Sequence, residues 1–113
     1  MHSGIHQYFI YITTNPGKTT LYVGVTNNLA ARIYEHWESR GHHETFAGKY
    51  FCYHLIYYEC FQNIQNAIAR EKEIKKWNRN KKYNLIRTQN PHWHFLNEMI
   101  CGQWPPQNMT RRY

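Results

Sequence analysis

The sequence lacks any long apolar segment. Its 113 residues contain no run of about 18 consecutive apolar side chains, the length that a helix needs to cross a bilayer. The first residues, MHSGIHQYF, lack the positively charged segment and apolar run of a secretory signal. Internal repeats and low-complexity tracts are also missing. We therefore expect a cytoplasmic protein that makes no use of a membrane.

Acidic residues are scarce. Seven Asp and Glu stand against 14 Lys and Arg, which gives a net charge of +7 and a sequence pI near 9.5. So few carboxylates argue against the acidic ligand cluster of a two-metal nuclease. A small basic domain expects an acidic partner, and nucleic acid is the commonest one.

Cysteines are few, and their number is odd. The three cysteines form no regular disulfide framework, which fits free thiols in a reducing cytosol. Eight histidines are present, but pairs such as His42-His43 lack the spacing of a structural zinc site. We expect no zinc site.

Aromatic and apolar side chains are abundant enough to build a core. They include ten tyrosines, and the aromatic share of 17% argues against disorder. The local patterns predict strands at 7–13 and 20–25, a helix at 29–37, a strand at 49–59, a helix at 63–78, a helical turn at 81–87 and a helix at 92–100. This order, β-β-α-β-α-α, predicts an α/β sandwich with a small three-stranded antiparallel sheet flanked by helices. We expect one domain over residues 1–100 and a C-terminal tail over 101–113.

The first two strands form a predicted hairpin around the turn TNPGKTT. If its loop is symmetric about Pro16 and Gly17, Tyr11 lies directly opposite Tyr22 and both side chains share one face of the sheet. In the helix that follows, Arg32 and His36 are one turn apart and also share a face.

One carboxylate falls on the apolar side of the helix at 63–78. At about 100° per residue, Glu71 lies within the stripe formed by Ile64, Ala67, Ile68, Ile74 and Trp77. A carboxylate in this position needs compensation. An ion pair with Arg or Lys is one solution, and a single bound metal ion is the other.

The same region is strongly basic. A solvated helix face explains such a run, but the interleaved Trp77 and Tyr83 and the charge of +7 equally favour a surface that binds phosphates. Gly24, which has no side chain, would let a phosphate approach the backbone. The candidate nucleic-acid contacts are Gly24, Lys72, Lys75, Lys76, Arg79, Lys81 and Lys82.

Several of these residues follow a known motif order. Phe9-Ile10-Tyr11 and Tyr22-Val23-Gly24 are followed by Arg32, His36 and, within AIAREKEIKKW, Glu71. From residue 8 to about residue 100, the chain resembles the GIY-YIG nuclease superfamily. It is most similar to short stand-alone bacterial members that resemble the nuclease domain of the excision-repair protein UvrC.

The chain departs from the family pattern at three positions. Phe9 stands where the first motif has Gly, as in other short members, and Val25 stands where the UvrC-like branch has Lys. Asn84 lies one residue away from the spacing of the usual late Asn. The missing Lys argues against a mechanism that uses its ammonium group.

The resemblance implies a metal-dependent endonuclease that hydrolyses DNA phosphodiester bonds, in repair, recombination or element mobility. Glu71 would bind one divalent cation, Mg²⁺ or Mn²⁺, without any small-molecule cofactor. Arg32 would hold a phosphate oxygen, and His36 would serve as a second base or a proton relay. Tyr11 and Tyr22 would position and deprotonate the water, and which of them is the base stays open.

Two alternatives remain at this point. The first is a nucleic-acid-binding module that keeps the fold without activity, although the five intact motif residues argue against it. The second is an RNA-processing nuclease, which the positive charge would serve equally well. A protein-interaction domain is a more remote option, and the oligomeric state is open.

Overall fold

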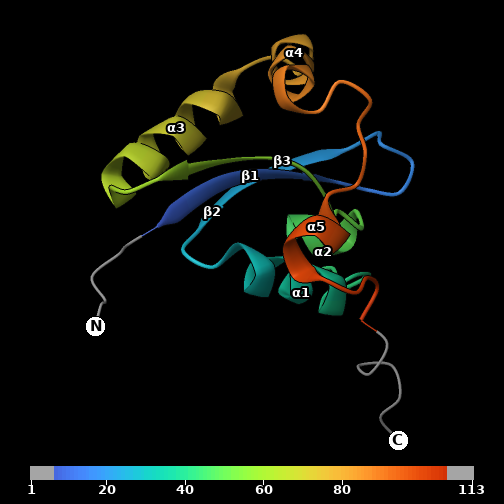
Figure 1. Cartoon of the computed structure of the whole chain (residues 1–113). Helices are drawn as coiled ribbons and strands as arrows, with labels where there is room; N and C mark the ends of the chain where they lie inside the picture. The colour runs from blue at the N-terminus through green and yellow to red at the C-terminus, as the bar shows by residue number, and fades with distance from the viewer. Residues whose placement is uncertain (1–6, 107–113) are drawn as a thin grey trace, which may run out of the picture.

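The computed structural model describes residues 7–106 and shows a three-stranded antiparallel sheet with helices on both faces (Figure 1). The elements are β1 (Tyr8–Thr14), β2 (Leu21–Thr26), α1 (Leu29–Glu38), α2 (Phe46–Lys49), β3 (His54–Phe61), α3 (Ile64–Lys76), α4 (Arg79–Gln89) and α5 (Asn97–Cys101). The predicted fold class and the order of its main elements are confirmed. No helix within residues 7–106 is long and apolar enough to cross a membrane.

The sequence prediction was wrong at some element boundaries. β3 begins at His54, later than expected, because residues 46–49 form the short helix α2 and Phe51 has a φ of 58°. The predicted helical turn at 81–87 is part of the longer helix α4. The predicted last helix at 92–100 is limited to α5, and the residues before it run along the edge of β3.

The strand order is β2-β1-β3, so β1 lies at the centre of the sheet. Helices α3 and α4 lie on one face, and α1, α2 and α5 lie on the other (Figure 1). Successive side chains of a strand point to opposite faces, so β1 contributes to two apolar clusters. One cluster is made of Ile10, Ile12, Val23, Ile56, Tyr57, Ala67, Ile74 and Ile86, and the other is made of Tyr11, Leu29, Ile33 and Leu55.

The register of the hairpin differs from the predicted one. Tyr11 lies opposite Gly24, and Tyr22 lies opposite Thr13. The tight turn does surround Pro16 and Gly17, since the Lys18 N–H donates to the Asn15 carbonyl, but the loop is longer after it. Lys18 has a φ of 60°, and the Thr19 and Thr20 N–H groups donate to the Asn15 side chain, so the strand pairing is centred one residue later than expected. A shift of this kind moves the pairing by two residues and preserves the face, so Tyr11 and Tyr22 still point to the same side.

The outer edge of β3 is covered by residues 89–97, whose side-chain amides replace a fourth strand. Asn97 accepts a hydrogen bond from the Leu55 N–H at 2.7 Å and donates one to the Tyr53 carbonyl at 2.8 Å. Asn90 donates to the Ile56 carbonyl at 3.0 Å. An exposed strand edge invites unwanted pairing, and these amides satisfy it instead.

The start of the predicted tail lies against α1. The Trp104 ring lies 5.6 Å from Tyr34 and 5.5 Å from Trp37, centroid to centroid, and the Tyr34 hydroxyl donates to the Cys101 carbonyl. Residues 107–113 lie outside the described residues. The boundary at residue 100 stays a prediction, but residues 101–106 clearly pack on the domain.

Replacing Asn97 by Ala tests how much the covered edge contributes to stability. The substitution leaves the buried Leu55 N–H of β3 and the partly buried Tyr53 carbonyl just before it without partners, so we expect the free energy of unfolding to fall by about 2 to 4 kcal/mol. Urea denaturation measures this change. The matched control is Asn80→Ala on exposed α4, and equal stability of the two variants would contradict the assignment.

Candidate functional site

Four of the predicted site residues meet on the α1 face of the sheet. Tyr11 and Tyr22 come from neighbouring strands, and Arg32 and His36 come from α1. The ring centroids of Tyr22 and His36 lie 5.3 Å apart, and those of Tyr11 and Tyr22 lie 6.2 Å apart. The cavity beside them has a volume of about 230 Å³ and is lined by Tyr22, Arg32, Glu35, His36, Ser39, Thr45 and Ala47.

Tyr11 lies beneath this cavity and is fully buried. Its hydroxyl oxygen lies 2.8 Å from Nε2 of His36, which joins the central strand to α1. Burial, followed by the neighbouring Tyr22, raises the pKa of Tyr11 well above its ordinary value, and Arg32 offsets only part of this effect. Tyr11 is therefore a protonated phenol at neutral pH.

His36 is neutral at the same pH. Burial and then the positive charge of Arg32 lower its pKa to about 4. A protonated phenol and a neutral imidazole can share this hydrogen bond with either group as the donor, according to the tautomer of His36. In both cases Tyr11 fixes the orientation of the His36 ring.

Gly24 has a packing role, whereas the phosphate approach that the sequence suggested stays a prediction. It is buried, and the Tyr11 ring lies across it. A Cβ atom at this position would lie 2.5 Å from the Tyr11 hydroxyl oxygen and 2.6 Å from the ring carbon that carries it. The glycine is needed because the ring occupies the space of a side chain.

Arg32 is held at the mouth of the cavity by Glu35. Its Nε lies 3.0 Å from the Glu35 carboxylate, one helical turn away, and both side chains are partly exposed. The sequence reasoning missed Glu35, although the spacing of three residues in a helix was a usable signal. It also missed Thr45 and Ala47, because no helix or strand was predicted between residues 37 and 49.

Glu71 is not part of this group of four, because it lies on α3 across the sheet. Its side chain is only 15% exposed, and its Oε2 lies 3.1 Å from Nζ of Lys75. The sequence left open whether an ion pair or a bound metal ion compensates this carboxylate. The structure contains the ion pair, with Lys75. The expected inward position of Glu71 is observed.

The contacts of α3 show which strand each side of the helix faces. Ala67 and Ile74 form the buried line of the helix, and Arg70 and Glu71 flank that line on opposite sides because of the helical rotation. Arg70 reaches Glu59 on β3 at 2.9 Å. Since the strand order is β2-β1-β3, Glu71 lies on the side of β2.

The position of Glu71 along β2 follows from two contacts. Glu59, the β3 residue that pairs with Arg70, is level with Val25 of β2, because both lie opposite Ile10 of β1. Arg79, just after α3, donates to the Thr19 carbonyl at 2.7 Å. The helix therefore runs back along β2 towards its start, and Glu71 lies near the edge of the sheet that carries the second motif.

The donor set of Glu71 suits a hydrated hard cation. Within residues 7–106, no three or more His, Cys, Asp or Glu side chains gather into a metal site. Mg²⁺ keeps several of its waters and is commonly held by one or two carboxylates, so a single half-buried Glu is sufficient. The ammonium of Lys75 already pairs with this carboxylate, which shows that the position accommodates positive charge.

The predicted basic residues divide into two groups. Lys72, Lys75, Lys76 and Lys81 are exposed on α3 and α4. Lys75 pairs with Glu71, and the Lys81 ammonium lies 4.4 Å from the centroid of the Trp77 ring. These side chains face solvent and form a cationic surface beside the Glu71 side of α3.

Arg79, which is exposed, and Lys82, which is partly buried, lie beside a second cavity. They line a cavity of about 140 Å³ together with Thr20, Leu21 and Phe46. Burial, followed by the charge of Arg79, lowers the pKa of Lys82. Phe46 also stacks on Tyr22, so a ring that lines this cavity packs against a ring that lines the tyrosine cavity.

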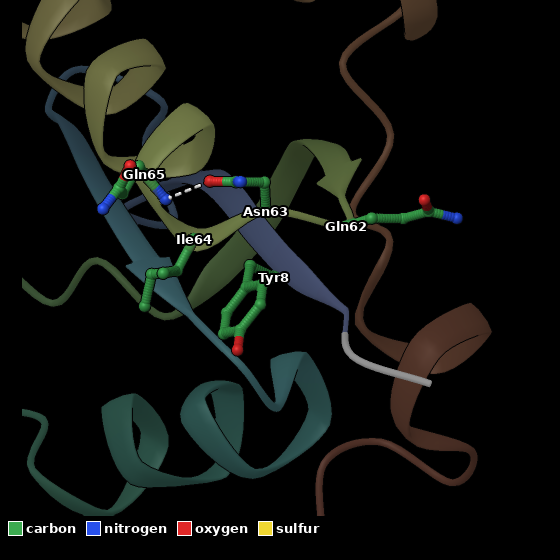
Figure 2. Close-up of a pocket in the computed structure, with 5 residues that line it drawn as sticks. All are labelled: Tyr8, Gln62, Asn63, Ile64 and Gln65. Atoms are coloured by element: carbon green, nitrogen blue, oxygen red, sulfur yellow. Dashed lines mark hydrogen bonds between the residues drawn. The ribbon is translucent and has the colours of Figure 1, made fainter. Parts of the chain in front are cut away.

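A separate hollow of about 300 Å³ lies at the start of α3 (Figure 2). Figure 2 shows Tyr8 and Ile64 beside it, and the Gln65 backbone N–H donates to the Asn63 side chain, which caps the helix. Among the described residues that line it, none carries a charge. This hollow borders the N-terminal cap of α3, and we assign it no catalytic role.

Comparisons with known proteins agree with the motif pattern. The sequence model of the GIY-YIG catalytic domain matches residues 7–84. UPF0213 proteins of Staphylococcus aureus strains Mu50 and N315 are 32% identical over 80 residues, which cover 71% of this chain and 94% of theirs. The solution NMR structure of the UPF0213 protein BH0048 from Bacillus halodurans has the same fold, with a TM-score of 0.50 and 22% identity over 84% of this chain and 98% of that one.

Replacing Gly24 by Ala tests the packing beneath the site. The new methyl group would displace the Tyr11 ring and break its bond to His36, so we expect a loss of about 1 to 3 kcal/mol in the free energy of unfolding. Urea denaturation measures the loss, and NMR of the His36 ring reports the bond. The control is Gly17→Ala, where an added Cβ meets nothing closer than 3.9 Å. Equal effects at both glycines would contradict this packing.

The stability of the protein should fall as the pH is lowered from about 6.5 towards 4. In this window the unfolded chain protonates His36 near its ordinary pKa of about 6.5, whereas the folded protein keeps it neutral. We expect a loss of about 1 to 2 kcal/mol at pH 5 from this residue. His54, whose pKa burial also lowers to about 4, adds a similar loss.

Urea denaturation of the wild type and of His36→Gln at a series of pH values separates the two histidines. Glutamine does not titrate, so the variant should lose less stability between pH 7 and pH 5 than the wild type. Parallel pH profiles would show that His36 is not held neutral.

Proposed function

The chain belongs to the GIY-YIG nuclease family, and on this premise we propose that it is a metal-dependent endonuclease that hydrolyses phosphodiester bonds in DNA. The proposal places its action in the cytoplasm, in DNA repair, recombination or element mobility. The observation that carries the proposal is the convergence of Tyr22, Arg32 and His36 on one cavity.

Arg32 is the candidate phosphate-binding residue. Its guanidinium lines the cavity, and its planar set of donors matches two oxygens of a phosphate. The ion pair between Arg32 and Glu35 is exposed to solvent and therefore weak. Arg32 can exchange the Glu35 carboxylate for a phosphate oxygen at little cost in free energy. Glu35 holds the side chain in place before the substrate arrives.

The two tyrosines have different roles in this proposal. Tyr22 lines the cavity, so its oxygen can hold the attacking water. It would accept the proton of that water only as a phenolate, which becomes the neutral phenol, and the positive charge of Arg32 in the same cavity would stabilise the phenolate beforehand. Tyr11 is buried and protonated, so we assign it the role of a positioning residue for His36.

Glu71 is the candidate ligand of the metal ion. A divalent cation bound there would supply Lewis-acid stabilisation of the phosphoryl and leaving oxygens. Glu71 lies beside β2, which also carries Tyr22, so the carboxylate and the tyrosine would reach one substrate from opposite faces of the same strand. The cationic surface of Lys72, Lys75, Lys76 and Lys81, together with Arg79 and Lys82, would bind the flanking phosphates.

Cleavage assays with Mg²⁺ or Mn²⁺ test the proposal on branched, single-stranded and supercoiled DNA. We expect Glu71→Gln to lower the cleavage rate at least about 100-fold, because the charge that holds the cation is lost. The control Glu73→Gln removes a carboxylate from the same helix that is exposed and pairs with Arg70, and it should cleave like the wild type.

Undiminished cleavage by Glu71→Gln would refute the metal assignment. Salt-dependent DNA binding without cleavage by any of the three proteins would show a binding module instead of an enzyme. Cleavage of RNA in preference to DNA would change the substrate while keeping the site.

A further inference from the structure

We propose that Phe46 and Tyr50 form an aromatic platform on which an unpaired base of the substrate stacks, next to the phosphate that is cleaved. The inference rests on the proposed nuclease function and names its substrate class: nucleic acid with single-stranded nucleotides at the cleavage position. Neither residue belongs to the motifs that the sequence pointed to.

The platform is exposed and packs against Tyr22, which lines the cavity. Phe46 is 50% exposed and Tyr50 is 41% exposed, and their ring centroids lie 4.7 Å apart. The inner side of Phe46 stacks on Tyr22 at 6.3 Å with an interplanar angle of 25°. The platform therefore continues the aromatic lining of the cavity out to the surface.

The platform is held in place by its local structure. Thr45 caps α2 by accepting a hydrogen bond from the Gly48 N–H, and the Tyr50 N–H donates to the Phe46 carbonyl. Ala47 and Gly48 are buried. Because the small residues face inward, the two aromatic rings are left outward in a preformed arrangement, which lowers the entropy lost on binding.

The charges around the platform favour a nucleic-acid strand as the occupant. The Lys49 ammonium lies 5.3 Å from the centroid of the Tyr50 ring. On the other side, Arg79 and Lys82 share a cavity with Phe46. Aromatic rings between cations are the arrangement that binds single strands, because bases stack on the rings while phosphates contact the cations.

A base within a duplex cannot use the platform. Both of its faces are covered by neighbouring bases, so it must first be unstacked at a cost of a few kcal/mol. Flaps, bulges and single strands offer free base faces without this cost. The platform therefore favours cleavage at unpaired nucleotides.

The test measures the binding of fluorescently labelled oligo(dT) by anisotropy in EDTA, where no cleavage occurs. We expect Phe46→Leu and Tyr50→Leu each to weaken binding about 5- to 20-fold, because leucine keeps the apolar surface but has no ring face. Binding of a blunt duplex should change by less than about 2-fold, since its bases do not reach the platform. The control is Phe95→Leu, which alters an exposed ring that stacks on His54 of β3, at the other edge of the sheet.

Thermal denaturation shows whether each variant is folded. Two variants are used so that a folding defect in one of them leaves the other for the test. Phe46 contacts Tyr22, whereas Tyr50 is one helical turn further along and contacts Phe46. If Phe46→Leu and Tyr50→Leu are folded and bind oligo(dT) with wild-type affinity, the platform is overturned. An equal loss of oligo(dT) affinity in Phe95→Leu would also overturn it. The same holds if the wild type does not bind oligo(dT) at low salt.

A cleavage assay of the wild type with Mn²⁺ separates this inference from the proposed function. Cleavage by the wild type with unchanged oligo(dT) binding in the variants overturns the platform alone. Weakened oligo(dT) binding in the variants without any wild-type cleavage supports the platform and overturns the nuclease activity.

Discussion

The hydrogen bond between the Tyr11 hydroxyl and Nε2 of His36 is the contact on which the candidate site depends. It joins the central strand to α1 in a buried position, where an unpaired polar group would be costly. It forms only because Gly24 leaves room for the Tyr11 ring on the neighbouring strand. With the sheet and α1 fixed in this way, Tyr22 and Arg32 project into the same cavity.

The two edges of the sheet serve different purposes. Side-chain amides of the segment 89–97 satisfy the edge of β3, and Arg70 ties α3 to that strand through Glu59. The same ion pair sets the rotation of α3, so that Glu71 faces β2. The tyrosine cavity therefore lies on one face of the sheet at β2 and the candidate metal ligand on the other, which is how distant motifs would serve one site in the proposed function.

Much of this arrangement follows from local sequence patterns, and the remainder depends on long-range packing. Runs of β-branched and aromatic residues predicted β1 and β2, helical spacing placed Arg32 beside His36, and the apolar stripe of α3 showed that Glu71 points inward. The register could not be read from the turn, because it depends on the conformation of Lys18. The burial that keeps Tyr11 and His36 neutral, and the outward rings of α2, come from contacts between elements that are far apart in the sequence.

The central claim is that one cation at Glu71 serves the same site as Tyr22. Paramagnetic broadening of backbone amide signals by substoichiometric Mn²⁺ measures this directly in the intact protein. The account predicts that Mn²⁺ broadens the signals of Glu71 and of the facing β2 residues Val23 and Gly24, and that Glu71→Gln abolishes this effect. Broadening centred on His42 and His43, with sharp signals at Glu71 and β2, would contradict it.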